Sequence, residues 1–414
     1  MTDTSTRIDI ERVLRRVSDL AAIGAIPDTT GCARLALSDP DRAARDLVVT
    51  WMRDLGLDVR IDAIGNVAGV WGGRDPEARP VMCGSHIDTV KTGGRYDGAF
   101  GVLAGLEVIE CLIERGERPR RPIAVAFFTD EEGARYAPDM LGSLVFVGGM
   151  TVESARDVVG IDGTTVGGEL DRIGYTGSLP CPMLVPHAYI ELHIEQGPVL
   201  EAEGFTIGAV TGVQGISWQE LTFRGQSNHA GTTPMSMRHD AGYVAARVAA
   251  YVRELVSEIG DGQVGTVGAI NLDPNLVNVV AARATLTVDL RNTDEATLRR
   301  AEESLAAFVA RAARDEGVEV ESRVLARFEP VHFDDRLIDL VEARARALDY
   351  PVRRMASGAG HDAQMLARLC PAAMIFVPSH DGLSHNVAEH TDPRDLAAGA
   401  NVLFDVLLQL AEET

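Results

Sequence analysis

Histidines and carboxylates gather in four short segments of this 414-residue sequence. They are GSHIDTV at 84–90 with GGRYDG at 93–98, TDEEG at 129–133, ELHIEQGP at 191–198, and SHNVAEH at 384–390. His86 follows the apolar run 81–83, and the acids of the second segment follow the apolar run 123–128. Both runs predict buried strands. Because open α/β folds bind ligands at the carboxyl ends of strands, we expect these groups at the ligand-binding edge of a sheet.

Asp130, Glu131 and Glu132 place three adjacent carboxylates at the end of one apolar strand. Their repulsion must be offset, and a multivalent cation is the simplest group that does so. The four segments supply imidazoles and carboxylates but no thiolates, which suits Zn, Mn, Co or Ni. Hydrolysis at a two-metal centre requires a carboxylate that bridges two ions and a spare Glu beside a ligand Glu.

Each segment also has a plain structural interpretation. Asp97 could cap the helix that begins near residue 101, and the acids of 129–133 could form a solvated turn. His193 shares one strand face with Glu191 and Glu195, and a lone histidine there is more often a satisfied core or surface residue. Four histidines lie near the C-terminus, and most are expected to face solvent or form hydrogen bonds: His361, His380, His385 and His390.

The composition narrows the class of protein. Hydrophobic residues make up 46% and charged residues 24%, which predicts a large core and no disorder. The net charge of −22 argues against nucleic acid and anionic membrane partners and favours a small-molecule substrate. No apolar run approaches the ~20 residues of a membrane helix, and the first 14 residues lack an apolar signal core. Five cysteines without a CxxC pair favour a cytoplasmic protein.

The elements that must position the four segments alternate between strands and helices. An amphipathic helix is predicted from Ile8 to Leu20, a helix at 101–115 ending near Gly116, a strand at 373–377, and a closing helix at 394–412. This alternation predicts an α/β fold with a mixed, mostly parallel sheet flanked by helices.

The pattern changes between residues 212 and 326. Strands are predicted at 217–224, 285–291 and 318–325, with amphipathic helices at 241–259 and 296–316. The order strand, helix, strand, helix, strand predicts a compact α+β insert. We therefore expect a catalytic domain of residues 1–211 and 327–414 that carries an inserted domain of residues 212–326.

The segments together resemble the dinuclear metal amidohydrolases of the M20 peptidase clan. The resemblance is carried by GSHIDTV…GGRYDG, TDEEGARY, HIEQGP and SHNVAEHT, in this order and at this spacing, and it extends from about residue 60 to 400. More narrowly, they resemble the carbamoylase branch of N-carbamoyl-L-amino-acid hydrolases, β-ureidopropionases and allantoate amidohydrolases. Peptidase members usually carry a carboxylate at the position of His193, so this histidine favours the carbamoylase branch.

The resemblance implies two divalent ions and a role for each residue around them. His86 and His193 would ligate one metal, Glu132 and His385 the other, Asp97 would bridge both, and Glu131 would be the general base. Asp88 would be the acid that orients the imidazole of His86. The native metal, Zn, Mn, Co or Ni, stays open.

The insert resembles the clan's lid and dimerisation domain, which implies a homodimer formed through the lid. His229, within SNHAGTTP, would polarise the carbamoyl oxygen, either in its own chain or across the dimer. Asn278 and Arg291 would hold the substrate α-carboxylate, and Gln196 would contact the carbamoyl end. From the residues alone, Arg291 could instead form an ion pair with Asp289.

These roles imply a metalloenzyme that hydrolyses an N-carbamoyl-L-amino acid or N-carbamoyl-β-alanine to the amino acid, CO2 and ammonia. An allantoate amidohydrolase and an N-acyl-amino-acid amidase are the enzyme alternatives. A metal-free binding relative is a different class, and it would be expected to have lost some of the metal-centre residues. A serine hydrolase is disfavoured because no GxSxG elbow occurs.

Overall fold

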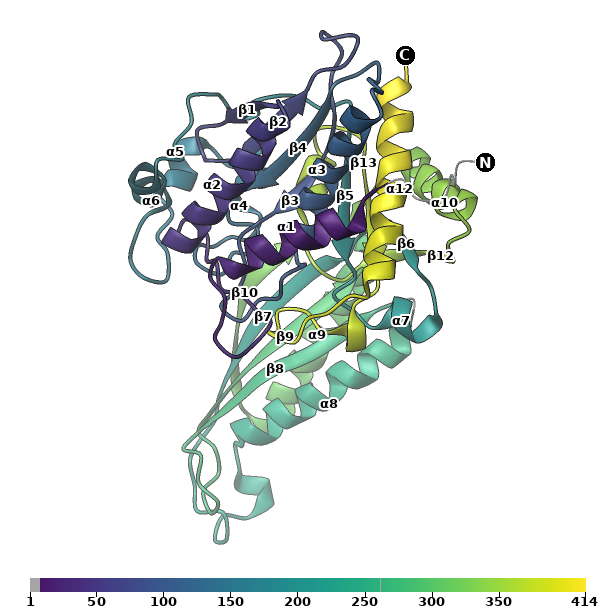
Figure 1. The fold of residues 1–414 in the computed structure, drawn as a ribbon. Coiled ribbons are helices and arrows are strands. Elements are labelled where there is room, and N and C mark those ends of the chain that lie inside the picture. Colours follow the sequence, from purple (N-terminus) through teal and green to yellow (C-terminus); the bar gives the residue numbers. More distant parts are fainter. Residues whose placement is uncertain (1–7, 261) are drawn as a thin grey trace. The chain divides into compact units, whose positions relative to one another are not determined.

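The computed structural model describes residues 8–260 and 262–414, which form two compact units (Figure 1). The first unit contains the described residues up to Gly212 together with His332–Thr414, and the second contains Val213–Val331. The sequence predicts that the first 14 residues lack an apolar signal core. Residues 1–7 of that stretch lie outside the described residues. No helix in the described part of the chain is long and apolar enough to cross a membrane.

A nine-stranded sheet forms the centre of the first unit. Its order is β1-β2-β4-β3-β5-β13-β6-β11, with β12 beside β6. The strands are β1 (Asp58–Ile61), β2 (Val67–Trp71), β3 (Val81–His86), β4 (Ile123–Phe128), β5 (Ala188–Ile194), β6 (Ile207–Val213), β11 (Val331–His332), β12 (Val352–Ser357) and β13 (Ala372–Val377). The four central strands β4, β3, β5 and β13 run parallel, whereas β2 and β6 pair antiparallel with β4 and β13. The predicted mixed α/β class is confirmed.

Helices pack on this sheet and shield its central strands from solvent. The longer ones are α1 (Ile10–Ala22), α2 (Asp39–Asp54), α3 (Ala99–Glu114), α10 (Asp335–Ala347) and α12 (Pro393–Glu412). Both α3 and α12 are apolar on most of their faces because they lie between the sheet and other helices. Five helices are short: α4 (Leu141–Phe146), α5 (Val152–Arg156), α6 (Val166–Ile173), α7 (Val199–Glu203) and α11 (Asp362–Leu366). The helices predicted near Ile8–Leu20, 101–115 and 394–412 are confirmed.

Gly84 allows β3 and β4 to pair up to their last residues. Its φ is +151°, and a Cβ at this position would lie 1.9 Å from the main-chain oxygen of Ala126. Only glycine tolerates this approach and this backbone conformation. The pairing therefore continues to His86 opposite Phe128, where both strands end.

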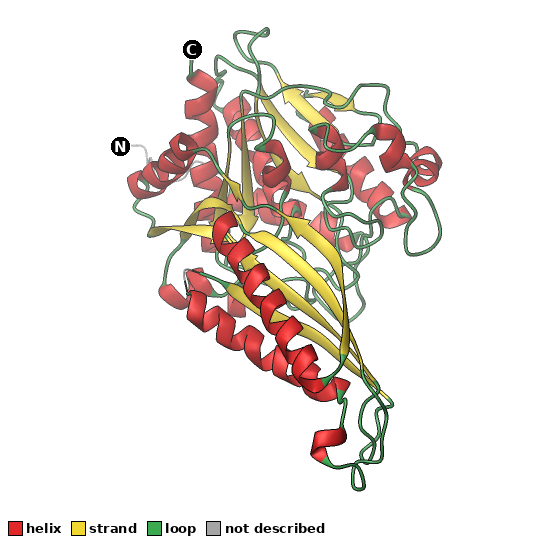
Figure 2. Cartoon of the chain, turned by 180° about the vertical axis from the view of Figure 1, so that it is seen from behind, coloured by secondary structure: helices red, strands yellow, loops and turns green. Residues whose placement is uncertain are grey.

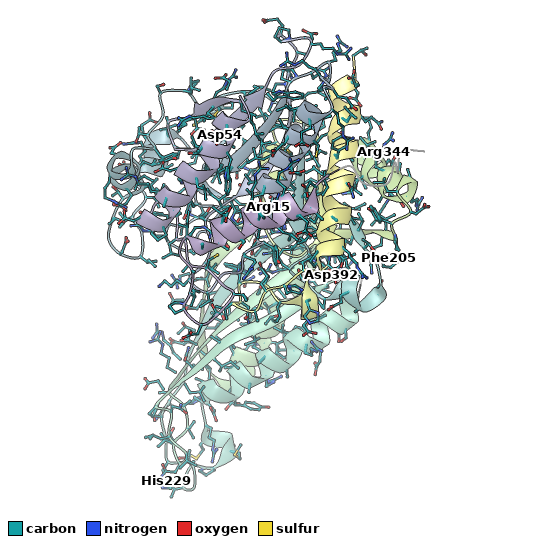
Figure 3. The ribbon with its side chains drawn as sticks, viewed as in Figure 1. Arg15, Asp54, Phe205, His229, Arg344 and Asp392 are labelled. Atoms are coloured by element: carbon teal, nitrogen blue, oxygen red, sulfur yellow. The ribbon has the colours of Figure 1, made fainter. Side chains whose placement is uncertain are left out.

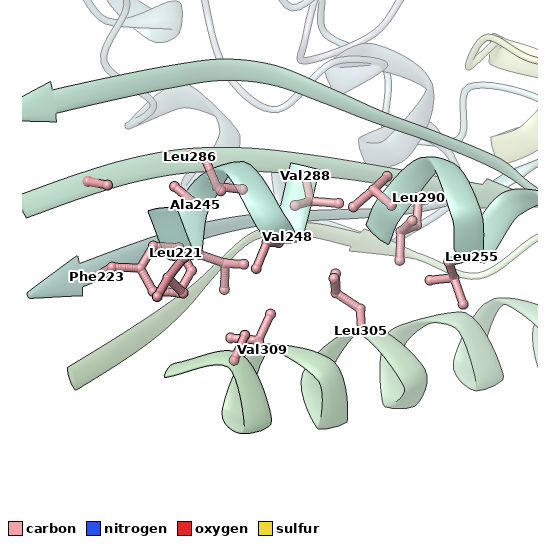
Figure 4. Packing of buried hydrophobic residues seen from close by; sticks show 14 of the residues in the cluster. Leu221, Phe223, Ala245, Val248, Leu255, Leu286, Val288, Leu290, Leu305 and Val309 are labelled. Carbon is pink, nitrogen blue, oxygen red and sulfur yellow. The ribbon is translucent and has the colours of Figure 1, made fainter. Parts of the chain in front are cut away.

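The second unit is a four-stranded antiparallel sheet covered on one face by two helices (Figure 2). The sheet order is β10-β7-β9-β8. The elements are β7 (Gly215–Arg224), α8 (Ala241–Ile259), β8 (Val264–Asp273), β9 (Arg283–Asn292), α9 (Glu295–Glu316) and β10 (Glu319–Phe328). Its core lies between sheet and helices and includes Leu221, Phe223, Val248, Leu286 and Leu305 (Figure 4).

Strand β8 was missed by the sequence prediction, which counted three strands in this region. The strand is an edge strand whose side chains are mostly exposed, so it lacks the alternation of buried and exposed residues that marks β9. Two glycines, Gly265 and Gly268, further lower its strand propensity. The other predicted strands and both predicted helices of this region are confirmed.

Candidate active site

Three strands and two loops of the first unit bring the predicted metal-binding residues to one edge of its sheet. His86 is the last residue of β3, and Glu131 and Glu132 follow β4 after two residues. His193 lies in β5, next to β3. Because β3, β4 and β5 are parallel, their carboxyl ends meet at this edge. Asp97 lies in the loop before α3, and His385 lies in the loop between β13 and α12.

Asp97 lies at the centre of this group and faces three histidines. Its Oδ1 is 3.5 Å from Nε2 of His86 and 3.2 Å from Nε2 of His193, while its Oδ2 is 3.4 Å from Nε2 of His385. His385 Nε2 also lies 3.1 Å from Oε2 of Glu132. The residues thus form two potential metal-binding trios that share Asp97: His86, Asp97 and His193, and Asp97, Glu132 and His385.

Both buried histidines are oriented by main-chain oxygens. Nδ1 of His86 lies 3.0 Å from the carbonyl oxygen of Asp88, and Nδ1 of His193 lies 2.9 Å from that of Ile194. With Nδ1 directed at these carbonyl oxygens, Nε2 of each ring faces Asp97 and becomes available to a metal once it has lost its proton. The Asp88 carboxylate lies farther from His86 Nδ1, at 3.9 Å, and accepts the main-chain N–H groups of Glu131 and Glu132 at 3.4 Å.

The pKa values of several site residues are shifted because charged groups lie close together in a buried environment. Burial raises the pKa of Glu131 well above its usual range, although His86 opposes this shift. Burial would lower the pKa of His86, but the carboxylates around it, first of all Glu131, outweigh this and raise it. Hydrogen bonds to Asp97 and Glu132 raise the pKa of His385 to about 10. Without metal, the site therefore retains protons where a cation would bind.

A cavity of about 100 Å³ opens onto these residues. Its lining includes His86, Asp97, Glu131, Glu132, Asp139, His193, Gln196, Gly360, His361 and His385. Gln196 holds a left-handed φ of 59° and donates from Nε2 to Oδ2 of Asp97 at 2.9 Å. Its Oε1 is buried and has no hydrogen-bond partner in the described structure, which leaves one acceptor available to a ligand.

Sequence reasoning gave no role to His361, Ser384 and Glu389. His361 is buried, lines the cavity, and packs its ring 4.6 Å from that of His193. Its Nε2 lies 2.9 Å from the hydroxyl of Ser357, and burial lowers its pKa well below the usual value, so the ring is neutral. Ser384 and Glu389 contact the Asp97 loop. Both residues lie within the SHNVAEH segment, and their closeness to His385 in the sequence was the only sign that they belong to the site.

A larger cavity, of about 550 Å³, lies elsewhere on the first unit between α7 and the start of α12. Phe205 and Asp392, both labelled in Figure 3, belong to its lining. Of the two histidines in its lining, His380 is exposed and pairs through Nδ1 with Glu201 at 2.7 Å. This ion pair accounts for the local cluster of acidic groups without a ligand.

His229 lies in a loop of the second unit, beyond the strand ends (Figure 3), and the segment of Asn278 and Val279 runs beside it. His229 bridges to Val279, and the main-chain N–H of Ala230 donates to the carbonyl oxygen of Asn278 at 2.9 Å. His229 Nδ1 accepts the N–H of Gly231 at 3.0 Å. The ring therefore carries its proton on Nε2 and can donate it to a ligand.

Arg291 lies at the opposite end of β9 from these loops. Arg283, at the loop end, pairs with Asp273, whereas Arg291 pairs with Val264. Eight residues of strand correspond to roughly 26 Å, so one small molecule cannot contact both Arg291 and Asn278 of the same chain. Arg291 also forms the ion pair anticipated from the sequence, with Nη2 2.9 Å from Oδ2 of Asp289.

The similarity of this chain to known proteins extends over almost its full length. A model of the family described as Peptidase family M20/M25/M40 matches residues 82–409. An N-carbamoyl-L-amino-acid amidohydrolase of Rhizobium meliloti is 40% identical, over 98% of this chain and 97% of that protein. An allantoate amidohydrolase of Escherichia coli is 36% identical, over 95% and 96%. The crystal structure of a hydantoinase/carbamoylase-family amidase from Burkholderia multivorans is 45% identical, covers 99% of each chain, and superposes with a TM-score of 0.96.

Proposed function

The chain belongs to Peptidase family M20/M25/M40, and from this premise we propose that it hydrolyses the carbamoyl C–N bond of an N-carbamoyl-L-amino acid. The products are the free amino acid, CO2 and ammonia. The observation that carries the proposal is Asp97, one carboxylate shared by two groups of potential metal ligands, with Glu131 beside them. The full-length similarity to N-carbamoyl-L-amino-acid amidohydrolases supports the choice of substrate.

The donor set fits two divalent ions, of Zn, Mn, Co or Ni. His86, Asp97 and His193 would hold one ion, and Asp97, Glu132 and His385 the other. Each trio offers three ligand atoms within 4.8 Å of one another, all nitrogen or carboxylate oxygen. Bound there, two such ions supply Lewis acidity that lowers the pKa of water and polarises a carbonyl.

The chain's own residues move the proton and orient the substrate. Glu131 takes a proton from the attacking water and later delivers it to the leaving nitrogen. Its carboxylate lies 3.4 Å from His86, and burial raises its pKa, as suits a group that must both accept and release a proton. The unpartnered Oε1 of Gln196 accepts a hydrogen bond from the carbamoyl NH2 group. His229 donates from Nε2 to the carbamoyl oxygen.

The substrate α-carboxylate is held by Arg291 and Asn278 from two different chains. A guanidinium pairs well with a carboxylate, but Arg291 and Asn278 of one chain lie too far apart to bind it together. The second unit is therefore a lid that also dimerises. Its edge strand β8 supports this, because it is ten residues long and exposes apolar side chains, with Val264 44% and Ile270 48% accessible.

We place the reaction in the cytoplasm. In the described residues all five cysteines are unpaired, and four of them are buried, as suits a reducing compartment. The net charge of −22 favours a small-molecule substrate over nucleic acid or an anionic membrane.

Allantoate is the second candidate substrate, since the allantoate amidohydrolase of Escherichia coli is 36% identical over almost the whole chain. An N-acyl-amino-acid amidase would use the same centre without the carbamoyl contact of Gln196. A metal-free binding relative is disfavoured because the proposed metal ligands and Glu131 are all present and adjacent.

Ammonia release from a substrate panel tests the proposal. The panel contains N-carbamoyl-L- and D-amino acids, N-carbamoyl-β-alanine and allantoate. N-acetyl amino acids release no ammonia, so their hydrolysis is measured by release of the free amino acid. We expect the highest kcat/KM with an N-carbamoyl-L-amino acid. Preference for allantoate would establish the second candidate, and inactivity on all substrates with each of the four metals would refute a hydrolase.

A further inference from the structure

The two proposed metal-binding trios are supported very unequally by the fold. His86 and His193 are buried residues of adjacent strands, so their positions are fixed by the sheet. His385 lies in a loop, its side chain is 49% exposed, and its φ of 53° is left-handed. Asp97 also lies in a loop. The second trio thus combines residues of three loops, those of Asp97, Glu132 and His385, and depends on their keeping the same relative position.

Glu389 joins two of these loops, those of Asp97 and His385. Its Oε1 accepts the main-chain N–H groups of Tyr96 at 3.0 Å and Asp97 at 3.2 Å. Its Oε2 accepts the hydroxyl of Ser384, 3.2 Å away, and that hydroxyl also lies 3.0 Å from Oδ2 of Asp97. The Glu389 side chain is only 3% exposed, so these contacts are not replaced by water. The carboxylate connects segments about 290 residues apart.

Gly94 provides the space for this side chain. A Cβ on Gly94 would lie 2.0 Å from both Cδ and Oε1 of Glu389. The carboxylate therefore lies directly against the backbone of the Asp97 loop. A side chain at position 94 would displace the Glu389 carboxylate without changing any charge.

We propose that Glu389 is a positioning residue that holds the His385 loop against the Asp97 loop and so builds the second metal site. The proposal rests on the proposed two-metal function. Glu389 itself contacts no metal in this scheme. It fixes the main-chain N–H groups of Tyr96 and of Asp97 itself, while the His86 and His193 end of the centre is held by the sheet.

Calorimetric titration of the metal-depleted full-length protein with Mn²⁺ or Zn²⁺ tests this. Glu389→Ala should raise the Kd of the second ion at least tenfold. The Kd of the first ion should rise clearly less, because Asp97 is shared but His86 and His193 stay fixed by the sheet. Glu389→Gln should retain most of the second-ion affinity, because its Oε1 can still accept both N–H groups. Gly94→Ala should reproduce the selective loss seen with Glu389→Ala.

Two matched variants control for burial and for glycine replacement. Glu107→Gln changes another fully buried glutamate, which pairs with Arg12 away from the centre. Gly72→Ala adds a Cβ where nothing lies within 4 Å. Both should bind two ions as the wild type does.

Equally weakened binding of both ions in Glu389→Ala would overturn the proposal. It would indicate that Glu389 acts only through its negative charge near the centre. Unchanged affinity for the second ion would overturn it as well, as would a Glu389→Gln loss equal to that of Glu389→Ala. If Glu389→Ala does not fold, Gly94→Ala decides the question alone. Wild-type protein that binds fewer than two ions would instead refute the two-metal function itself.

Discussion

Glu131 and Glu132 are adjacent in sequence, yet their carboxylates contact different histidines. Oε2 of Glu131 lies 3.4 Å from Nε2 of His86, and Oε2 of Glu132 lies 3.1 Å from Nε2 of His385. The second oxygen of Glu132 accepts the main-chain N–H of Val90 at 3.3 Å, which fixes its direction. The two neighbouring carboxylates thus point in different directions, as the two roles proposed for them require.

The first prediction distinguishes these functions by substitution. Glu131→Gln should retain its metal and lose about 10²–10⁴-fold in kcat, the usual contribution of a general acid–base group. Glu132→Gln should instead lose metal, because it removes a ligand of the second trio. Metal content by elemental analysis and kcat at saturating metal measure the two effects. Equal metal loss in both variants would show that the assignment is wrong.

Removal of metal should abolish turnover reversibly. Dialysis against a chelator should leave folded, inactive protein, and Mn, Co, Ni or Zn should restore activity. Binding should also stabilise the fold, by about 2.7 kcal/mol for one site when the free ion is at 100 times its Kd. Thermal unfolding with and without added ion measures this. Full activity in rigorously metal-free protein would contradict the proposal.

Metal affinity should rise with pH. In the metal-free protein the pKa of His385 is raised to about 10, so its ring is protonated at neutral pH. An ion must displace that proton, and each proton released makes the affinity about tenfold higher per pH unit. The pairing of protonated His385 with Asp97 and Glu132 stabilises the metal-free fold. This stabilisation is complete below the ordinary histidine pKa and is lost as the pH rises toward 10. Titrations between pH 6 and 8 measure the slope, and a flat profile would contradict the prediction.

The sequence indicated that His86, Glu131 and Glu132 lie close together because these residues are tied to buried strands. Apolar runs mark β3 and β4 clearly, and His86, Glu131 and Glu132 stand at or just after their ends. Parallel strands bring such ends together whatever the loops do. Edge strand β8 escaped prediction because neither of its faces is buried enough to produce a hydrophobic alternation.

Loop contacts were the part that the sequence could not predict. Nothing in local patterning indicates that Glu389 reaches the main chain at Tyr96, because that contact depends on two turns far apart in the chain. The orientation of His86 by the carbonyl oxygen of Asp88, rather than mainly by its carboxylate, is likewise a matter of backbone direction. The Arg291 pair with Asp289 was foreseen only as an alternative.

Arg291 should determine the preference for substrates that carry a carboxylate. Arg291→Lys retains the charge but loses the planar fork. The loss of charged hydrogen bonds, about 1.5–3 kcal/mol, predicts a decrease of roughly ten- to a hundredfold in kcat/KM with unchanged metal content. A carbamoyl substrate whose carboxylate is converted to an amide should lose far less. Asp289→Asn serves as the control, because it removes the existing partner of Arg291. Equal losses on both substrates would show that Arg291 only supports the strand.

Arg291 and the loop of His229 lie toward opposite ends of β9, because His229 bridges to Val279 just before Arg283. This separation predicts that active sites are completed between chains. In a symmetric dimer, a substrate that contacts both residues takes one from each chain. A mixed dimer of a His229→Ala chain and an Arg291→Ala chain then has one site with both residues intact and one site with neither. This holds whichever of the two residues crosses the interface.

Co-expression of the two inactive variants should therefore restore roughly a quarter of wild-type activity. Random pairing makes half of the dimers mixed, and each mixed dimer has one complete site of two. Co-expression of Glu131→Gln with each variant in turn identifies which residue crosses the interface. The variant chain keeps an intact Glu131, so its site regains activity only if the residue that it lacks is supplied by the Glu131→Gln chain. Co-expression of Glu131→Gln with His86→Ala should restore nothing, since both defects stay in their own chains. Without restoration in any pair, His229 and Arg291 cannot both contact the substrate, because the length of β9 forbids their meeting within one chain.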